Sequence, residues 1–134
     1  FIIFDKGNII MALSLNKFAA KDKIEVKIRN PETDEVLKDD DGKEVVAHLH
    51  SKASKVHKNA QLALQNRFLK ANKKTTSAER LEEESLELLI ACSIKIDNLE
   101  LNGKPIDNED TFRELFSDLE YDWLRQQIQD GLNE

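Results

Sequence analysis

Three histidines lie near one another in the sequence, and imidazole is a common zinc ligand. His48 and His50 alternate within a predicted strand and so share one face of it, while His57 follows near the start of the next element. That face lies opposite the apolar residues 45, 47 and 49, a pattern typical of exposed or interfacial side chains. We therefore expect no bound metal at the histidines.

An acidic turn is the second place where the sequence suggests a cation site. Asp39, Asp41 and Gly42 are reminiscent of a calcium-binding loop, in which glycine occupies the sixth position. Placing Gly42 there puts Leu37 at the first position and His48 at the twelfth, where carboxylates are required. The match fails, and the sequence predicts a solvated acidic turn.

Cys92 is the only cysteine and thus the only candidate thiol nucleophile. Its neighbours are apolar, an environment that raises the pKa of a thiol and makes it unreactive. The chain has four glycines and contains no glycine-rich phosphate loop, GxSxG turn or paired-carboxylate signature. We expect no catalytic residue and no cofactor, and hence a protein that is not an enzyme.

The charges are unevenly distributed along the chain. No acidic residue occurs between Val45 and Ala78, whereas from Asp107 to Glu134 nine acidic residues face two basic ones. The basic residues of the first region are Lys52, Lys55, Lys58, Arg67, Lys70, Lys73 and Lys74. They could follow a phosphate backbone, form a solvated face, or contact a protein partner or a neighbouring subunit. Nucleic acid is disfavoured, because no aromatic residues alternate with the bases and the net charge is −6.

The size and hydropathy of the chain indicate one domain. Its 134 residues are 40 % hydrophobic and 34 % charged, which suits a single core. No apolar run approaches the length of a membrane span, so we expect no membrane association. The only methionine, Met11, is preceded by Lys6-Gly7, whose codons could form a ribosome-binding sequence. We therefore interpret residues 1–10 as an upstream or non-native extension and 11–134 as the domain; the alternative is a genuine hydrophobic strand at residues 1–4.

The first half of the domain predicts a small β region. Residues 23–29 alternate between apolar and charged side chains, as a half-buried strand does, and residues 30–34 form a turn around Pro31. After the acidic turn, residues 45–50 alternate again, with 35–37 as a possible short strand between them. Together they predict an antiparallel hairpin or meander.

The rest of the chain predicts four helices. Residues 52–71 carry apolar side chains at helical spacing, with Val56 and Phe68 in the buried stripe. The stretch Thr76–Ile96 begins with a capping box and becomes apolar on most sides, so we expect it to be the central helix. Asn102-Gly103 then predicts a short hairpin, Asp107 or Asn108 a helix cap, and residues from 121 a last helix. The predicted fold class is α+β.

Several of these features occur together in a known family. They are the helix end at residues 86–92, the run LELNGKPI at 99–106, the capped acidic helix at 108–119, the run WLRQQI at 123–128, and SKASKVHKNA at 51–60. From about residue 13 to the end, the chain resembles the tail assembly chaperones of long-tailed bacteriophages and prophages. Family members often carry a tryptophan near the end of the central helix, where this chain has Ser93-Ile94-Lys95.

The resemblance implies a non-enzymatic function in the cytoplasm of the host cell. Such chaperones bind the tape-measure protein, recruit tail tube subunits during tail morphogenesis, and are not expected in the mature virion. A ring or spiral of identical subunits would provide the repeated apolar surface that an extended helical client needs. The expected partner or subunit contacts are Lys52, Lys55, Lys58, Leu62, Arg67, Leu69, Tyr121 and Trp123.

Two alternatives remain open at this point. One is a small nucleic-acid-binding or regulatory protein that uses the basic residues of the helix within 52–74. The other is a different virion assembly component, such as a head–tail connector protein.

Overall fold

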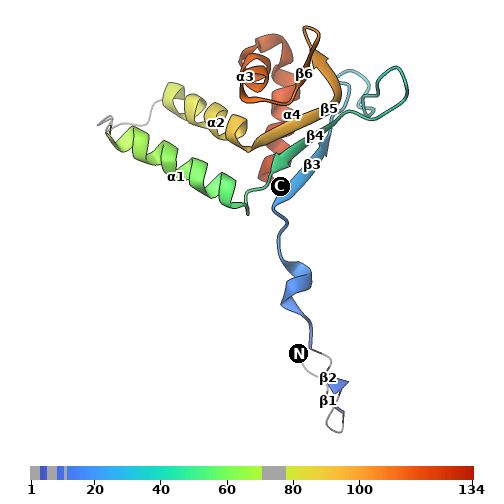
Figure 1. The fold of residues 1–134 in the computed structure, drawn as a ribbon, viewed down its shortest axis with the longest axis vertical. Helices are drawn as coiled ribbons and strands as arrows, with labels where there is room; N and C mark the ends of the chain where they lie inside the picture. The colour runs from blue at the N-terminus through green and yellow to red at the C-terminus, as the bar shows by residue number, and fades with distance from the viewer. Residues whose placement is uncertain (1–3, 6–8, 11, 71–77) are drawn as a thin grey trace.

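The fold is built around a four-stranded antiparallel sheet with the strand order β3-β4-β5-β6. Our computed structural model describes residues 4–5, 9–10, 12–70 and 78–134. The strands of this sheet are β3 (Lys23–Lys27), β4 (Val46–His50), β5 (Ser93–Leu101) and β6 (Lys104–Ile106). Four α-helices accompany the sheet, so the described chain has an α+β fold (Figure 1). None of the described helices is long and apolar enough to cross a membrane.

The small N-terminal hairpin or meander that we expected is not confirmed, because its strands belong to a four-stranded sheet. β3 pairs with β4 as expected, but β4 also pairs with β5, which lies beyond two helices in the sequence. The central helix ends at Cys92 and Ser93 begins β5 directly, so Ile94 and Ile96 belong to the sheet. Residues 94–97 alternate between more buried and more exposed side chains, as a strand does. Their pairing with β4 therefore replaces the continuation of the helix to Ile96 that we expected.

Asn102 and Gly103 connect β5 to β6. Both have positive φ (53° and 79°), the backbone conformation that a two-residue hairpin turn requires. Leu101 pairs with Lys104 across the turn. The short hairpin that we expected is not confirmed as an independent element, because its strands form one edge of the larger sheet.

The acidic turn between β3 and β4 is organised by its own side chains. The carboxylate of Asp39 accepts hydrogen bonds from the backbone N–H groups of Asp41 and Lys43, at 2.9 and 2.8 Å. Gly42 has a φ of +81°, which a residue with a Cβ rarely adopts. Asp40 and Asp41 are exposed, as the interpretation of a solvated turn predicts.

Helices α1 (Lys55–Lys70) and α2 (Ala78–Cys92) form an arm that projects sideways from the sheet (Figure 1). α1 begins after Ser54, whose hydroxyl accepts a hydrogen bond from the N–H of His57. Leu64 and Phe68 are buried, and α1 packs mainly against α2. The predicted capping box cannot be compared, because Thr76 lies outside the described residues.

Helices α3 (Glu109–Ser117) and α4 (Asp122–Asn133) cover one face of the sheet, with the short 3-10 helix η2 (Leu119–Tyr121) between them. Asn108 caps α3 as predicted, in a reciprocal pair of hydrogen bonds with Thr111. The helix that we interpreted as residues 108–119 ends earlier, and Leu119 is 89 % exposed. The helix stops at Ser117 because Asp118 caps η2, which turns Leu119 outwards.

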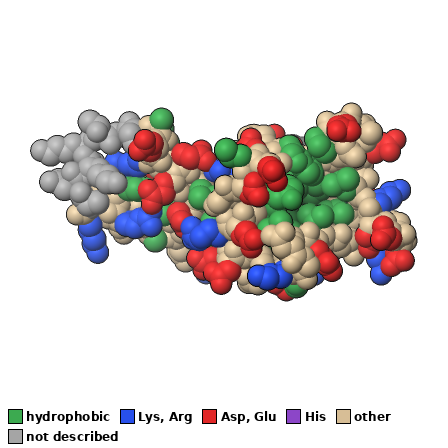
Figure 2. Space-filling model, turned by 90° about the horizontal axis from the view of Figure 1, so that it is seen from above, with side chains coloured by type: hydrophobic (Ala, Val, Ile, Leu, Met, Phe, Trp, Pro, Cys, Tyr) green, Lys and Arg blue, Asp and Glu red, His purple; other side chains and the backbone are tan. Residues whose placement is uncertain are grey.

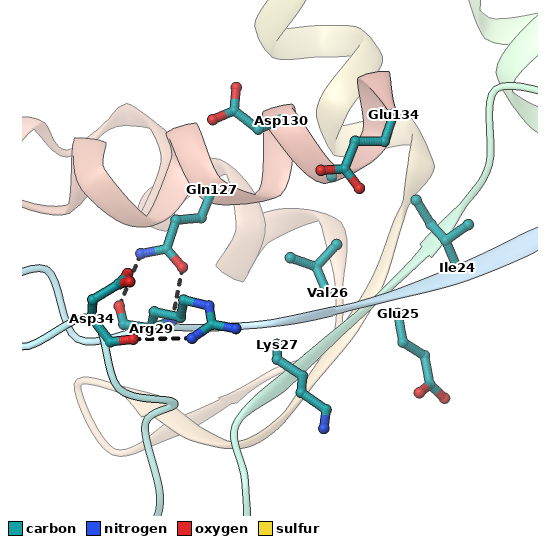
Figure 3. Close-up of a pocket in the computed structure, with 10 residues that line it drawn as sticks. Ile24, Glu25, Val26, Lys27, Arg29, Asp34, Gln127, Asp130 and Glu134 are labelled. Atoms are coloured by element: carbon teal, nitrogen blue, oxygen red, sulfur yellow. Dashed lines mark hydrogen bonds between the residues drawn. The ribbon is translucent and has the colours of Figure 1, made fainter.

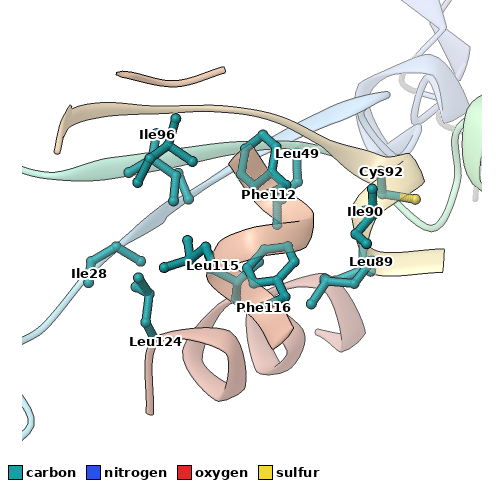
Figure 4. Packing of buried hydrophobic residues seen from close by; sticks show 14 of the residues in the cluster. Ile28, Leu49, Leu89, Ile90, Cys92, Ile96, Phe112, Leu115, Phe116 and Leu124 are labelled. Atoms are coloured by element: carbon teal, nitrogen blue, oxygen red, sulfur yellow. The ribbon is translucent and has the colours of Figure 1, made fainter. Parts of the chain in front are cut away.

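The hydrophobic core lies between the sheet, α3, α4 and the second half of α2 (Figure 4). Phe112 and Phe116 form its aromatic centre, with ring centroids 5.5 Å apart. Cys92 is fully buried in the same core, and burial raises the pKa of its thiol to about 11. The prediction of a core cysteine is confirmed.

The described residues before β3 lie away from the body of the molecule (Figure 1). β1 (Phe4–Asp5) and β2 (Ile9–Ile10) pair with each other, and the 3-10 helix η1 (Leu15–Phe18) follows. Residues 12–22 are all exposed. The interpretation of residues 1–10 as an extension falls largely outside the described residues and stays a prediction.

An ion pair fastens α2 to α3. The guanidinium of Arg113 donates two hydrogen bonds to the carboxylate of Glu87, at 2.6 and 3.0 Å. These bonds lower the pKa of Glu87, while burial acts in the opposite direction. A carboxyl group whose pKa is lowered by folding stabilises the native state above its unfolded pKa, and this contribution is lost as the pH falls through the folded pKa.

We expect Glu87→Gln to lower the free energy of unfolding by about 1 kcal/mol at neutral pH, since solvent weakens a partly exposed pair. The difference from the wild type should shrink below about pH 4.3, the ordinary pKa of glutamate. Urea unfolding of the variant and the wild type, at neutral and at acidic pH, measures this difference in the free energy of unfolding. Glu109→Gln is the control, because Glu109 also contacts Arg113 but its side chain is 72 % exposed. A difference that does not change with pH would contradict this role.

Candidate interaction surfaces

The arm exposes two leucines on one side of α1. Leu62 and Leu69 are separated by seven residues, about two helical turns, so they point in similar directions. Their exposed fractions are 48 % and 74 %. Both residues are among the partner or subunit contacts expected from the sequence, and both are exposed.

Two further apolar residues of the arm are exposed and were missed from the sequence. Val56, which we placed in the buried stripe, is 38 % exposed, and Leu81 on α2 is 54 % exposed. The reason is that α1 has a single neighbouring helix, so only a narrow stripe around Leu64 and Phe68 is covered. On the face seen in Figure 2, the arm shows scattered hydrophobic side chains among acidic and basic ones.

The basic residues near α1 do not act as one group. Lys52 donates from Nζ to the backbone carbonyl of Asn133 at 2.9 Å, near the C-terminus of α4. Arg67 forms an ion pair with Glu83 at 3.0 Å. The side chains of Lys55 and Lys58 are exposed and form no hydrogen bond or ion pair with the described residues. Lys52 and Arg67, two of the seven bases proposed for phosphate binding, are therefore engaged by protein groups.

Tyr121 and Trp123 lie on the body of the molecule, at the junction of η2 and α4. Both are half-buried and pack against the hydrophobic core. The structure thus places them on different elements from the leucines of α1. The neighbouring Leu119 is far more exposed than either aromatic residue.

His48 and His57 occupy separate environments. His48 lies on the face of the sheet opposite α3 and α4, with Nε2 2.7 Å from the Asp97 carboxylate, and this hydrogen bond lowers the pKa of Asp97. His57 is buried in the arm, where burial and the nearby Lys52 lower its pKa. Among the described residues, no group of three or more side chains is arranged to hold a metal ion.

A groove of about 680 Å³ runs between β3 and α4. β3 is an edge strand, so within the described part of the chain one side of its backbone has no neighbouring strand. Ile24 and Val26 point from β3 towards α4, whereas Glu25 and Lys27 point away (Figure 3). The groove therefore combines a free strand edge with half-buried apolar side chains.

Gln127 and Gly131 of α4 determine the shape of this groove. The side-chain amide of Gln127 accepts from the backbone N–H of Arg29 at 2.8 Å and donates to its carbonyl at 2.9 Å (Figure 3). At Gly131, a Cβ would lie 2.3 Å from Cγ2 of Val26, so glycine permits the close approach of α4 to β3. α4 continues past Gly131 to Asn133.

The lining of the groove is more acidic than basic. Its carboxylates belong to Glu25, Asp34, Asp130 and Glu134, against the cationic Lys27 and Arg29. This groove was not predicted from the sequence, because the identity of an edge strand depends on long-range pairing.

Comparisons with known proteins found no matching family model, no similar curated protein and no similar solved structure.

Proposed function

We propose that this chain is a tail assembly chaperone of a long-tailed bacteriophage or prophage, which binds the tape-measure protein and recruits tail tube subunits. The resemblance described above suggests the family, and the exposed leucines of the arm are the observation that carries the proposal. Leu62 and Leu69 lie on one side of a projecting helix, 48 % and 74 % exposed. Such a row can pack against the apolar stripe of a client helix.

The proposed chaperone acts without catalysis. It covers the apolar surface of the client in the host cytoplasm until the tube assembles, and it leaves before the virion is complete. Repetition of the arm in a ring or spiral of subunits would match a long helical client. The engagement of Lys52 and Arg67 by Asn133 and Glu83 favours this protein-binding role over nucleic-acid binding.

Co-expression with the tape-measure protein of the same gene cluster tests the proposal. The wild-type chain should keep the client soluble and co-purify with it. We expect Leu62→Asp with Leu69→Asp to weaken the complex by about tenfold or more, because two leucines lose their apolar contacts. Gln61→Asp with Ala63→Asp adds the same charge at exposed positions of α1 that lie about 100° to either side of Leu62, and it should retain binding.

The alternatives give different results in companion measurements. A nucleic-acid-binding protein would bind duplexes in a salt-dependent manner and would lose affinity on Lys55→Ala and Lys58→Ala. A head–tail connector would remain in the finished particle. A gene located away from the tube and tape-measure genes, together with no client complex, would refute the chaperone proposal.

A further inference from the structure

The outer edge of β3 is available for pairing with another strand. The N–H of Ile28 donates to Val45, on the β4 side of the strand. In an antiparallel ladder the N–H and C=O of one residue point to the same side, and the side alternates along the chain. Lys23, Glu25 and Lys27 therefore direct their backbone groups away from β4. Arg29 follows the same alternation, and there the side chain of Gln127 takes the position of a neighbouring strand.

Residues 12–20 expose apolar side chains that their own body does not cover. Leu13, Leu15 and Phe18 are 67 %, 82 % and 67 % exposed. The only regular structure in this segment is η1, which has no buried residue, so little stability is lost if it extends. In an extended chain Leu13 and Leu15 lie on the same face.

We propose that residues 12–20 of one copy of this chain add as an extended strand to the β3 edge of a second copy, in the groove beside α4. Pairing would satisfy the outward backbone groups of β3, as in other cases of strand addition. Leu13 and Leu15 would extend the apolar surface of Ile24 and Val26. This self-association uses a different surface from the client-binding leucines and does not depend on the proposed chaperone function.

The charges of the segment and the groove are complementary. Residues 12–20 contain Lys17 and no acidic residue. The groove carries four carboxylates and two cationic side chains, with Asp130 and Glu134 exposed on its α4 side. An extended segment with a basic residue therefore matches the groove better than an acidic peptide does.

The connection to β3 directs the segment towards another copy. Ser51, after β4, donates from its N–H to the carbonyl of Asp22 at 2.7 Å and from its hydroxyl to the carbonyl of Lys21. These bonds hold the chain beside β4 up to Lys21. To pair with β3 of the same chain, the segment would have to reverse its direction within residues 18–20. To pair with β3 of a second copy, it needs no turn.

Sedimentation velocity on the full chain tests the proposal. We expect reversible self-association, with slower amide exchange at Lys23, Glu25 and Lys27 as the concentration rises. A wild-type chain that stays monomeric at every concentration overturns the proposal. Protection of residues 12–20 in a monomer overturns it as well, because the segment would then pair within its own chain.

Two variants separate the receiving edge from the donated segment. Glu25→Pro removes an outward N–H that the sheet does not use, and proline is tolerated at such edge positions. It should weaken association at least about tenfold, while the matched Glu25→Thr keeps the N–H and should associate as the wild type does. Leu13→Asp with Leu15→Asp should have a similar effect, and it cannot unfold the body because neither side chain is buried.

A mixture of the two variants gives the decisive result. Glu25→Pro retains an intact segment and the Leu13/Leu15 variant retains an intact edge, so together they should form a one-to-one complex that neither forms alone. Failure to form this complex, when both variants show native circular dichroism, overturns the proposal. If Glu25→Pro does not fold, a synthetic peptide of residues 12–22 must compete with self-association of the wild type, and a peptide without effect overturns it equally.

Discussion

Leu115→Ala is expected to lower the free energy of unfolding by about 2–5 kcal/mol, the usual cost of removing a leucine from a packed core. Leu115 is 2 % exposed and belongs to the cluster in which α3 packs against the sheet and α4. The substitution removes apolar contacts and leaves a cavity that the stiff sheet on one side cannot fill. Because a domain of this size has a total stability of about 5–15 kcal/mol, the effect should be evident in urea unfolding.

Leu119→Ala is the matched control for this prediction. The chemical change is the same and the position lies four residues further on, but Leu119 is 89 % exposed. We expect a change within about 0.5 kcal/mol. Equal losses at the two positions would show that α3 continues through Leu119 and that the described end of the helix at Ser117 is incorrect.

Local patterns in the sequence predicted most of the helices and strands. The features that were not predicted depend on how the strands pair with one another. The strands near residues 23–29 and 45–50, the helix after Ser54 and the cap at Asn108 were all predicted from short-range signals. The junction at Ser93 was not, because apolar residues continue from α2 into β5 without a turn residue between them. Only pairing with β4 decides whether the residues after Cys92 continue the helix or form a strand.

The candidate surfaces were predictable to different degrees. Exposure of Leu62 and Leu69 followed from their helical positions, since only the stripe facing α2 is covered. The exposure of Val56 and Leu119 did not, because it depends on how many elements surround α1 and on where α3 ends. The groove beside β3 depends on the order of strands in the sheet and on the approach of Gly131 to Val26, neither of which has a local signal.

The arm and the body differ in how many elements support them, and this difference predicts separate stabilities. Leu89 and Ile90 anchor the second half of α2 in the main core. α1 packs mainly against α2, with Phe68 as its largest buried side chain, 3 % exposed. The guanidinium carbons of Arg67 and Arg80 lie 5.1 and 4.3 Å from the centroid of the Phe68 ring and cover it. Regions with few apolar contacts open at lower free energy than the core does.

Phe68→Ala should therefore open the arm while the body stays folded. The substitution costs about 3–5 kcal/mol of packing free energy. This cost is expected to exceed the free energy that keeps a contact between only two helices closed. In hydrogen exchange measured by mass spectrometry, amides of α1 should lose protection, whereas those of β4 and β5 should keep it. Leu69→Ala, at the adjacent 74 % exposed position, should leave both unchanged. Parallel loss of protection in α1 and the sheet would mean that arm and body unfold as one unit, because the support given by α2 would then couple them fully.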